Sequence, residues 1–303
     1  MSKQVLSFIG LLLTGAGLFA QPAQNDIATP AVQSIQLSTG VNLQYVEQGN
    51  PSGTPVIFLH GFTDSWHSYE LVLPHLPATL HAFALSQRGH GDAEKPLAGY
   101  DPKDFAADVA AFLEAKKIKA ALVVGHSMGS IVAQRFAIDH PSKTMGIVLI
   151  GTFADFNSNE TIQGFGQVLD TLNDPIEEKF AAEFQQSTLG NPIPPAFLQT
   201  MIQESLKVPA RVWKSVADPL FKVNYVPLLK AYTKPVLIVW GDKDLFSPRQ
   251  DQDVLANALS RSQLVVYTGI GHAVHWEAPA RFTADLVIFA RQLNHQSRNR
   301  YEK

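Results

Sequence analysis

The sequence predicts a doubly wound α/β domain with a mostly parallel, eight-stranded sheet and a helical insertion before its last two strands. Six short apolar runs show no polar alternation, which is typical of parallel strands covered by helices on both faces. Helix-period segments at 105–115 and 127–139 lie between these runs, and such alternation of strand and helix indicates a doubly wound sheet. The six runs are Val56–Leu59, Ala82–Leu85, Leu122–Val124, Ile147–Ile150, Val236–Val239 and Leu264–Tyr267.

The chain begins with a segment that resembles a secretory signal peptide. Lys3 precedes an apolar run from Val5 that ends in small residues up to Ala20. This run of 16 residues contains 3 glycines, and it is shorter than the roughly 20 residues that span a bilayer. We therefore expect a signal peptide at 1–20, cleavage after Ala20, and a periplasmic or secreted protein. The alternative is an uncleaved N-terminal membrane anchor.

The remaining elements follow in chain order. The polar, proline-bearing residues 21–31 predict a linker, and alternating runs at 32–37 and 41–46 predict an antiparallel hairpin at the sheet edge. The α/β core is expected over 32–152 and 234–295, followed by a polar tail at 296–303. Residues 153–233 lack a buried-strand pattern and are rich in helix formers, so we expect a helical cap over the end of the sheet. Most of its aromatic residues are expected to form the cap's own core. They are Phe156, Phe165, Phe180, Phe184, Phe197, Trp213 and Phe221.

Charge and composition exclude several classes of partner. The 24 basic and 27 acidic residues are scattered, with a net charge of -3, so no basic stripe is available for nucleic acid. The absence of cysteine excludes a disulfide framework and a cysteine-linked lipid anchor. The ten histidines lack metal-ligand spacing, and we expect neither a metal nor an organic cofactor. The mature protein is expected to be soluble, without stable membrane insertion; oligomeric state leaves no mark on the sequence.

The strongest local motif is Gly125-His126-Ser127-Met128-Gly129. It follows a predicted strand and opens a predicted helix, the context of a nucleophile on a sharp strand-to-helix turn. Such a turn crowds its neighbours, which explains the glycine two residues to either side. The helix N-terminus at Ser127 also favours developing negative charge. We therefore predict that Ser127 is a nucleophile.

A serine hydroxyl needs a base, and the base needs a carboxylate that fixes its tautomer. His272 follows the last predicted strand, on the same rim of the sheet as Ser127. His275, close by, is interpreted as a packing residue. Of the two carboxylates in Gly241-Asp242-Lys243-Asp244, we predict Asp244 as the partner because it lies further into the loop, whereas Asp242 braces the turn. Asp155, after the preceding strand, is the minority alternative.

An oxyanion hole needs two backbone amides that point at the developing charge. Met128, directly after the predicted nucleophile, is expected to supply one, and Phe62 in His60-Gly61-Phe62 the other. His60 itself is interpreted as structural. Four further side chains are expected to line a substrate pocket: Trp66, His126, Phe153 and Trp276.

Together these motifs resemble the α/β-hydrolase family. The resemblance covers about Val32 to Leu293 and implies the serine-nucleophile, esterase- or lipase-like branch with a helical cap. It also implies a catalytic triad of Ser127, Asp244 and His272. The motifs, in the family's order, are His60-Gly61-Phe62, Gln87-Arg88-Gly89-His90-Gly91, the Ser127 turn, Gly241-Asp242-Lys243-Asp244, and Gly271-His272 with Glu277 and Pro279 behind it.

The predicted site determines the class of reaction. A serine, a histidine base and an oxyanion hole stabilise a tetrahedral intermediate on a carbonyl, so acyl transfer to water is expected. We predict hydrolysis of a small, fairly apolar carboxylic ester or lactone through an acyl-enzyme. One alternative is a hydrolase of carbon–carbon bonds in diketone-like ring-cleavage products. The other, from a different class, is a ligand-sensing binding protein of the same fold.

Overall fold

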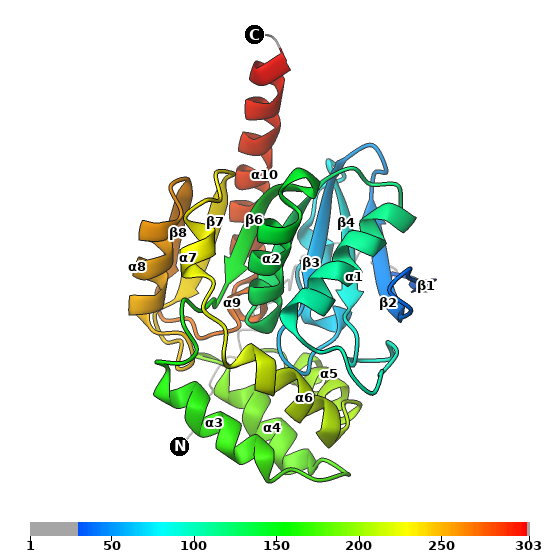
Figure 1. The fold of residues 1–303 in the computed structure, drawn as a ribbon, viewed down its shortest axis with the longest axis vertical. Helices are drawn as coiled ribbons and strands as arrows, with labels where there is room; N and C mark the ends of the chain where they lie inside the picture. The colour runs from blue at the N-terminus through cyan, green and yellow to red at the C-terminus, as the bar shows by residue number, and fades with distance from the viewer. Residues whose placement is uncertain (1–29, 302–303) are drawn as a thin grey trace, which may run out of the picture.

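The computed structural model describes residues 30–301, so the predicted leader at 1–20 and most of the predicted linker lie outside the described residues. It confirms the predicted fold class: an eight-stranded, mostly parallel sheet lies between two layers of helices (Figure 1). The strands follow the order β1-β2-β4-β3-β5-β6-β7-β8 across the sheet, and β1 and β2 are antiparallel to their neighbours. Their bounds are β1 Val32–Gln36, β2 Asn42–Gly49, β3 Thr54–Leu59, β4 Leu80–Ser86, β5 Ala121–His126, β6 Thr144–Ile150, β7 Val236–Gly241 and β8 Ser262–Tyr267.

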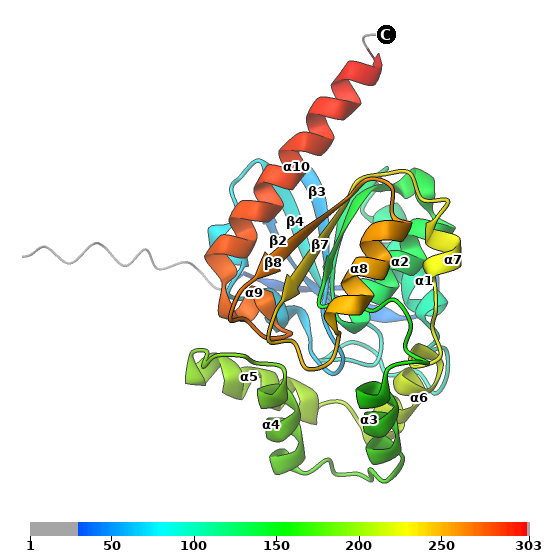
Figure 2. The ribbon, with the colours of Figure 1, turned by 90° about the vertical axis from the view of Figure 1, so that its left-hand side faces the viewer.

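The two faces of the sheet are covered by different helices. Side chains alternate across a strand, so Ile57 and Leu59 of β3 pack on one face while Val56 and Phe58 pack on the other. The 3-10 helices η1 and η2 lie with α9 and α10 on the second face, opposite α1, α2, α7 and α8 (Figure 2). These elements are η1 Trp66–Tyr69, η2 Leu73–His75, α1 Pro102–Ala115, α2 Met128–Asp139, η3 Pro141–Lys143, α7 Val226–Leu229, α8 Arg249–Ala258, α9 Val274–Glu277 and α10 Pro279–Tyr301.

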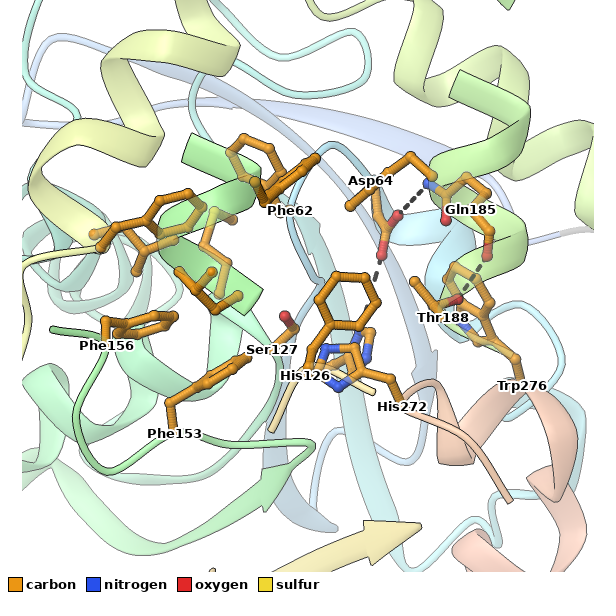
Figure 3. Close-up of a pocket in the computed structure, with 17 residues that line it drawn as sticks. Phe62, Asp64, His126, Ser127, Phe153, Phe156, Gln185, Thr188, His272 and Trp276 are labelled. Carbon is orange, nitrogen blue, oxygen red and sulfur yellow. Dashed lines mark hydrogen bonds and ion pairs between the residues drawn. The ribbon is translucent and has the colours of Figure 1, made fainter. Parts of the chain in front are cut away.

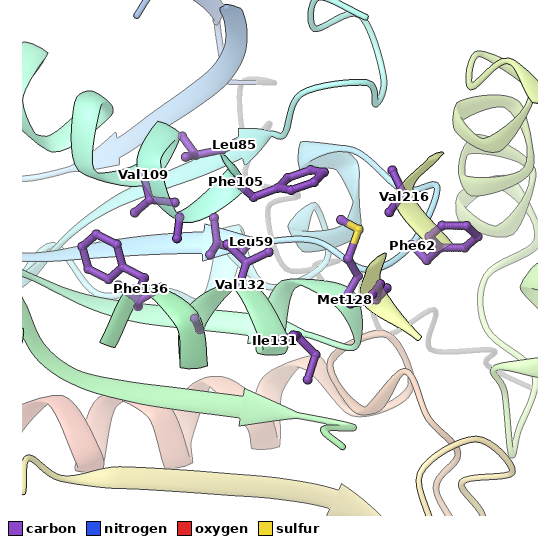
Figure 4. Close-up of a cluster of buried hydrophobic side chains, with 14 of the residues drawn as sticks. Leu59, Phe62, Leu85, Phe105, Val109, Met128, Ile131, Val132, Phe136 and Val216 are labelled. Carbon is purple, nitrogen blue, oxygen red and sulfur yellow. The ribbon is translucent and has the colours of Figure 1, made fainter. Parts of the chain in front are cut away.

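Four helices between β6 and β7 cover the carboxyl ends of the parallel strands (Figures 1 and 2). Asn159 begins the first of them by accepting a hydrogen bond from the amide of Ile162 at 3.1 Å. The apolar cluster between α1, α2 and the sheet continues into these helices: Phe62 and Val216 lie at its cap end (Figure 4). The helices are α3 Glu160–Asp170, α4 Glu178–Ser187, α5 Pro195–Leu206 and α6 Ala210–Leu220.

The turn after β4 is fixed by a buried ion pair. Arg88 donates to Asp108 of α1 through Nε and Nη2, both at 2.6 Å, and Thr39 donates to the same carboxylate. Bidentate geometry in a buried site makes this pair a strong orientational constraint. It holds the sequence Gln87-Arg88-Gly89 against α1, so this motif has a structural role.

The last helix includes most of the polar segment at the C-terminal end. The backbone of α10 is helical to Tyr301, so six of the eight residues expected as a polar tail continue this helix. In both ribbon views this helix extends beyond the layer of strands (Figures 1 and 2). Within residues 30–301, no helix has the length and apolar character needed to cross a membrane.

Candidate active site

Ser127 lies in a strained turn between β5 and α2. Its backbone has φ 50° and ψ -116°, a conformation that is uncommon for residues with a side chain. The amide of Ser127 donates to the carbonyl of Ile150 at 2.9 Å, so the turn is tied to the end of β6. The Ser127 side chain lines a pocket under the cap (Figure 3). The strain is therefore located where it exposes a hydroxyl at a helix N-terminus.

The two glycines of this turn permit close backbone contacts. A Cβ on Gly125 would lie 2.1 Å from the carbonyl oxygen of Gly129. A Cβ on Gly129 would lie 2.2 Å from the carbonyl oxygen of Leu59 in the neighbouring strand. Neither position can accept a side chain without moving backbone. The spacing seen in the sequence thus has a direct steric cause.

His272 and Asp244 come together from the loops after β8 and β7. His272 Nδ1 lies 2.7 Å from Asp244 Oδ2, and both side chains are buried. Asp244 also accepts from the amides of Phe246 and Ser247 and from the Ser247 hydroxyl. Burial alone would raise the pKa of Asp244, but His272 and the bonds from His272 and Ser247 outweigh it and hold that pKa below its usual value. The ionised carboxylate can only accept, so Nδ1 of His272 carries the proton and Nε2 is free to act as a base.

The cap supports the loop that carries His272. The backbone amides of His272 and Ala273 donate to the carbonyl of Thr188, at the end of α4, at 2.8 and 3.1 Å. Glu277 accepts from the amides of Gly190 in the cap and Gly271 in the loop. Cap and loop are therefore joined through both backbone and side chain.

The other candidate residues from the sequence lie in different environments. Asp242 accepts a hydrogen bond from the amide of Gly269 at 2.6 Å, and Asp155 accepts from Asn157. His275 is buried, with Nε2 3.1 Å from the hydroxyl of Ser68. Among the described residues, Asp244 is the one carboxylate that bonds His272.

The amides predicted to form an oxyanion hole flank the Ser127 turn. Met128 is the first residue of α2, where an amide has no acceptor within its own helix. Phe62 follows His60 and Gly61 after β3, and its amide has no hydrogen-bond acceptor among the described residues. His60 holds this loop: its Nδ1 donates to the Gly61 carbonyl and its Nε2 accepts from the amide of Gln87. His60 thus has the structural environment that the sequence suggested.

The pocket around Ser127 is mostly aromatic. Of the four side chains expected to line it, His126, Phe153 and Trp276 do so. Four of the seven cap aromatics also line it, more than we expected, because the apolar face of the cap helices closes the pocket as well as packing against itself. The apolar lining consists of Phe62, Met128, Phe153, Phe156, Ile162, Phe165, Phe184, Leu220, Phe221, Phe246 and Trp276.

Trp66 is not among the residues that line the pocket. It begins the 3-10 helix η1, which directs its ring into the apolar cluster on the opposite face of the sheet. The indole is buried and stacks on His67, with ring centroids 3.8 Å apart. The prediction that Trp66 lines this pocket is therefore wrong. Phe62, four residues earlier, forms the aromatic wall there and packs against Phe165 and Trp213 of the cap.

A family comparison matches this architecture. The model of the alpha/beta hydrolase fold family matches residues 54–279, from β3 to the start of α10. The chain belongs to the α/β-hydrolase family. As a member of that family, with hydrolases and esterases among its relatives, it is a hydrolase.

Three relatives illustrate the range of this family. The chain is 26% identical to a non-heme chloroperoxidase of Streptomyces lividans, over 85% of this chain and 99% of that protein. It is 27% identical to a pimeloyl-[acyl-carrier protein] methyl ester esterase of Neisseria meningitidis serogroup C, over 77% of this chain and 93% of that protein. The crystal structure of an esterase from Rhodococcus sp. ECU1013 superposes with a TM-score of 0.77 and 26% identity, covering 86% of this chain and 99% of that one.

The hydrolase pocket also contains polar residues that the sequence did not indicate. Asp64, two residues after Phe62, and Gln185 and Thr188 from α4 and its C-terminal end complete the lining. Burial raises the pKa of Asp64 to about 7, against hydrogen bonds from Gln185 and Ser68 that lower it. The one available signal was a carboxylate in the same loop as Phe62. Gln185 gave no signal, because a glutamine in an amphipathic helix resembles a solvated residue.

Proposed function

We propose that this α/β-hydrolase cleaves a carboxylic ester or lactone through an acyl-enzyme formed on Ser127. The observation that carries the proposal is the 2.7 Å contact between His272 Nδ1 and Asp244 Oδ2, in a site where Ser127 lines the same pocket. This contact favours the neutral tautomer that leaves His272 Nε2 unprotonated. The esterase names of two of the relatives support the same reaction class.

The chemistry follows from the position of each group. Ser127 Oγ attacks the ester carbonyl while His272 Nε2 takes its proton, and Asp244 stabilises the imidazolium. The amides of Phe62 and Met128 hold the negative oxygen of the tetrahedral intermediate. When the carbon–oxygen bond breaks, the imidazolium gives its proton to the leaving alkoxide. Water, activated by the same histidine, then hydrolyses the acyl-enzyme and releases the acid.

The lining of the pocket supports a small, largely apolar substrate. Eleven of its 17 lining residues are apolar or aromatic. Residues 153–233 supply seven of these, from α3, α4, α6 and the segments just before α3 and just after α6. Aromatic walls bind apolar groups and exclude water from the carbonyl. Export through the leader at 1–20 stays a prediction, and it suggests a substrate encountered outside the cytoplasm.

The proposal is tested by hydrolysis of p-nitrophenyl esters from acetate to a long acyl chain. The mature form starting at Gln21 should turn over the short esters, and Ser127→Ala should lower kcat by about six orders of magnitude or to background. Ser187→Ala, an exposed serine in the cap, is the matched control and should retain activity. Ester hydrolysis that survives in Ser127→Ala, or the absence of turnover on any ester, would contradict the proposal.

A further inference from the structure

Two buried polar side chains face the pocket and are not used in the mechanism above. Asp64 is 2% exposed and Gln185 is 1% exposed, yet both line the pocket beside Ser127. Asp64 belongs to the loop after β3, and Gln185 to helix α4 of the cap. A polar group removed from water costs free energy unless it is hydrogen-bonded. The hydrogen bonds that Asp64 and Gln185 make, and the acceptor positions that stay unused, therefore indicate which groups a ligand would supply.

The amide of Gln185 is fixed in one orientation. Its Nε2 lies 2.9 Å from Asp64 Oδ1 and 2.8 Å from Ser205 Oγ, so both amide hydrogens are used. Ser205 Oγ donates to the carbonyl of Met201 at 3.1 Å, so it accepts from Gln185 and sets the amide nitrogen toward Ser205 and Asp64. Gln185 Oε1 is then left as a buried acceptor that has no hydrogen-bond partner among residues 30–301. An acceptor fixed in this way is ready for a donor from a ligand.

The carboxylate of Asp64 is likewise not saturated with donors. Besides Gln185, the backbone of Gly61 and the hydroxyl of Ser68 donate to it. The Ser68 hydroxyl lies 3.3 Å from its second oxygen, which is also 3.9 Å from His126 Nδ1. Burial, with His275 and His272 nearby, lowers the pKa of His126 well below its usual value, so that ring is neutral. Within the described part of the chain, no lysine or arginine pairs with Asp64. A carboxylate has about four acceptor positions, and capacity remains.

These acceptors lie on one side of the reacting serine. Figure 3 shows Phe153 and Phe156 on one side of Ser127, and Asp64 and Gln185 on the other. Asp64 is two residues from Phe62, whose amide is the proposed oxyanion donor, and its neighbour His126 directly precedes Ser127. Because Asp64, Gln185 and Ser127 line the same pocket, a substrate group on this side shares the cavity with the scissile carbonyl.

We propose that Asp64 and Gln185 form a hydrogen-bond-accepting subsite, which selects esters that carry a hydroxyl or amide N–H close to the scissile carbonyl. The inference rests on the proposed ester hydrolysis and adds a substrate class to it. Apolar groups of the substrate occupy the phenylalanine side, and the donor occupies the side of Asp64. A site with buried acceptors discriminates strongly against an analogue that leaves those acceptors unpaired.

The experiment compares kcat/KM for two pairs of esters in which a hydroxyl replaces a methyl group. Methyl 3-hydroxybutanoate against methyl 3-methylbutanoate tests the acyl side, and 2-hydroxyethyl butanoate against propyl butanoate tests the alcohol side. Above pH 7, where Asp64 is ionised, we expect the wild type to prefer the hydroxyl member of at least one pair by about 10- to 100-fold, the range for a hydrogen bond to a charged group.

Asp64→Asn should abolish this preference. An asparagine can still accept from Gln185 Nε2 through Oδ1, which places its NH2 where Asp64 offers its second oxygen. The pocket then presents a donor in place of an acceptor, at nearly constant volume. Loss of packing alone would lower turnover of both members of a pair and leave their ratio unchanged. Asp251→Asn, a buried carboxylate that does not line the pocket, is the matched control and should keep the wild-type ratio.

The outcomes separate the two proposals. Equal turnover of both members of both pairs by the wild type would overturn the subsite while ester hydrolysis stands. An undiminished preference in Asp64→Asn would also overturn it. If the wild type hydrolyses no ester at all, the proposed function fails and the subsite fails with it.

Discussion

Removal of the Asp64 charge should change how stability depends on pH. Burial raises the pKa of Asp64 from 3.8 to about 7 in the folded protein, while an unfolded chain restores the ordinary value. Between these two values the folded state holds a proton that the unfolded state has lost. Stability contributed by this site therefore falls as pH rises from about 4 to about 7. Asp64→Asn has no proton to lose and should escape this fall.

The size of the effect follows from the two pKa values. Linkage gives a penalty of roughly 2 kcal/mol at pH 5 and roughly 4 kcal/mol at pH 7.5 for the ionisable side chain. Asp64→Asn should thus gain roughly 2 to 3 kcal/mol relative to wild type between these two pH values. The nearby His126 and His275 have strongly lowered pKa values and stay neutral throughout this window.

Urea unfolding followed by tryptophan fluorescence at pH 5, 6 and 7.5 measures this difference. The midpoint and slope give the free energy of unfolding of each protein. Ser205→Ala removes a neighbouring hydrogen bond to Gln185 without removing a titratable group, so its destabilisation should be the same at each pH. A difference between Asp64→Asn and wild type that does not vary with pH would refute the reasoning.

Three further changes test the site and the core. Asp244→Asn should lower kcat by about 10⁴-fold through loss of the correct histidine tautomer; steady-state kinetics with an activity near wild type would count against that role. Gly125→Ala should prevent folding or lower Tm sharply because its Cβ would lie 2.1 Å from the carbonyl oxygen of Gly129. The Cβ of Gly164→Ala, in α3, would meet no atom within 4 Å, so this control should stabilise the protein by up to about 1 kcal/mol. Thermal unfolding compares the two variants, and equal Tm values would show the steric argument to be mistaken. Asp108→Ala leaves a buried guanidinium unpaired and should cost about 3 to 5 kcal/mol in chemical denaturation; a loss below 1 kcal/mol would mean that the pair is effectively solvated.

The strands and the Ser127 turn could be read from the sequence because their constraints are local. A parallel strand buried on both faces must be apolar at every position, and a nucleophile turn needs glycine at fixed offsets. The loops after such strands end at one edge of the sheet, so His272 and Asp244 could be expected together before any coordinates. Their observed contact depends on topology that the strand pattern already implied.

The lining of the pocket depends on how the cap sits on the core, and that is not a local property. A phenylalanine in a cap helix is dehydrated whether it packs on its own helices or on a substrate pocket. Phe165 and Phe184 line the pocket while Phe180 does not, although all three come from helices of similar pattern. Trp66 was misplaced for a related reason, since a single turn of 3-10 helix decides which face of the sheet it meets.

The bonds from the amides of His272 and Ala273 to the carbonyl of Thr188 have a consequence for how this enzyme can diverge. A cap exchanged for that of a relative would bring its own backbone to this position, and with it a different position for His272, the proposed base. A cap that changes substrate specificity would therefore change the catalytic rate at the same time. Proteins that retain the end of α4 and vary α3 and α6 could change specificity without moving the loop that carries His272.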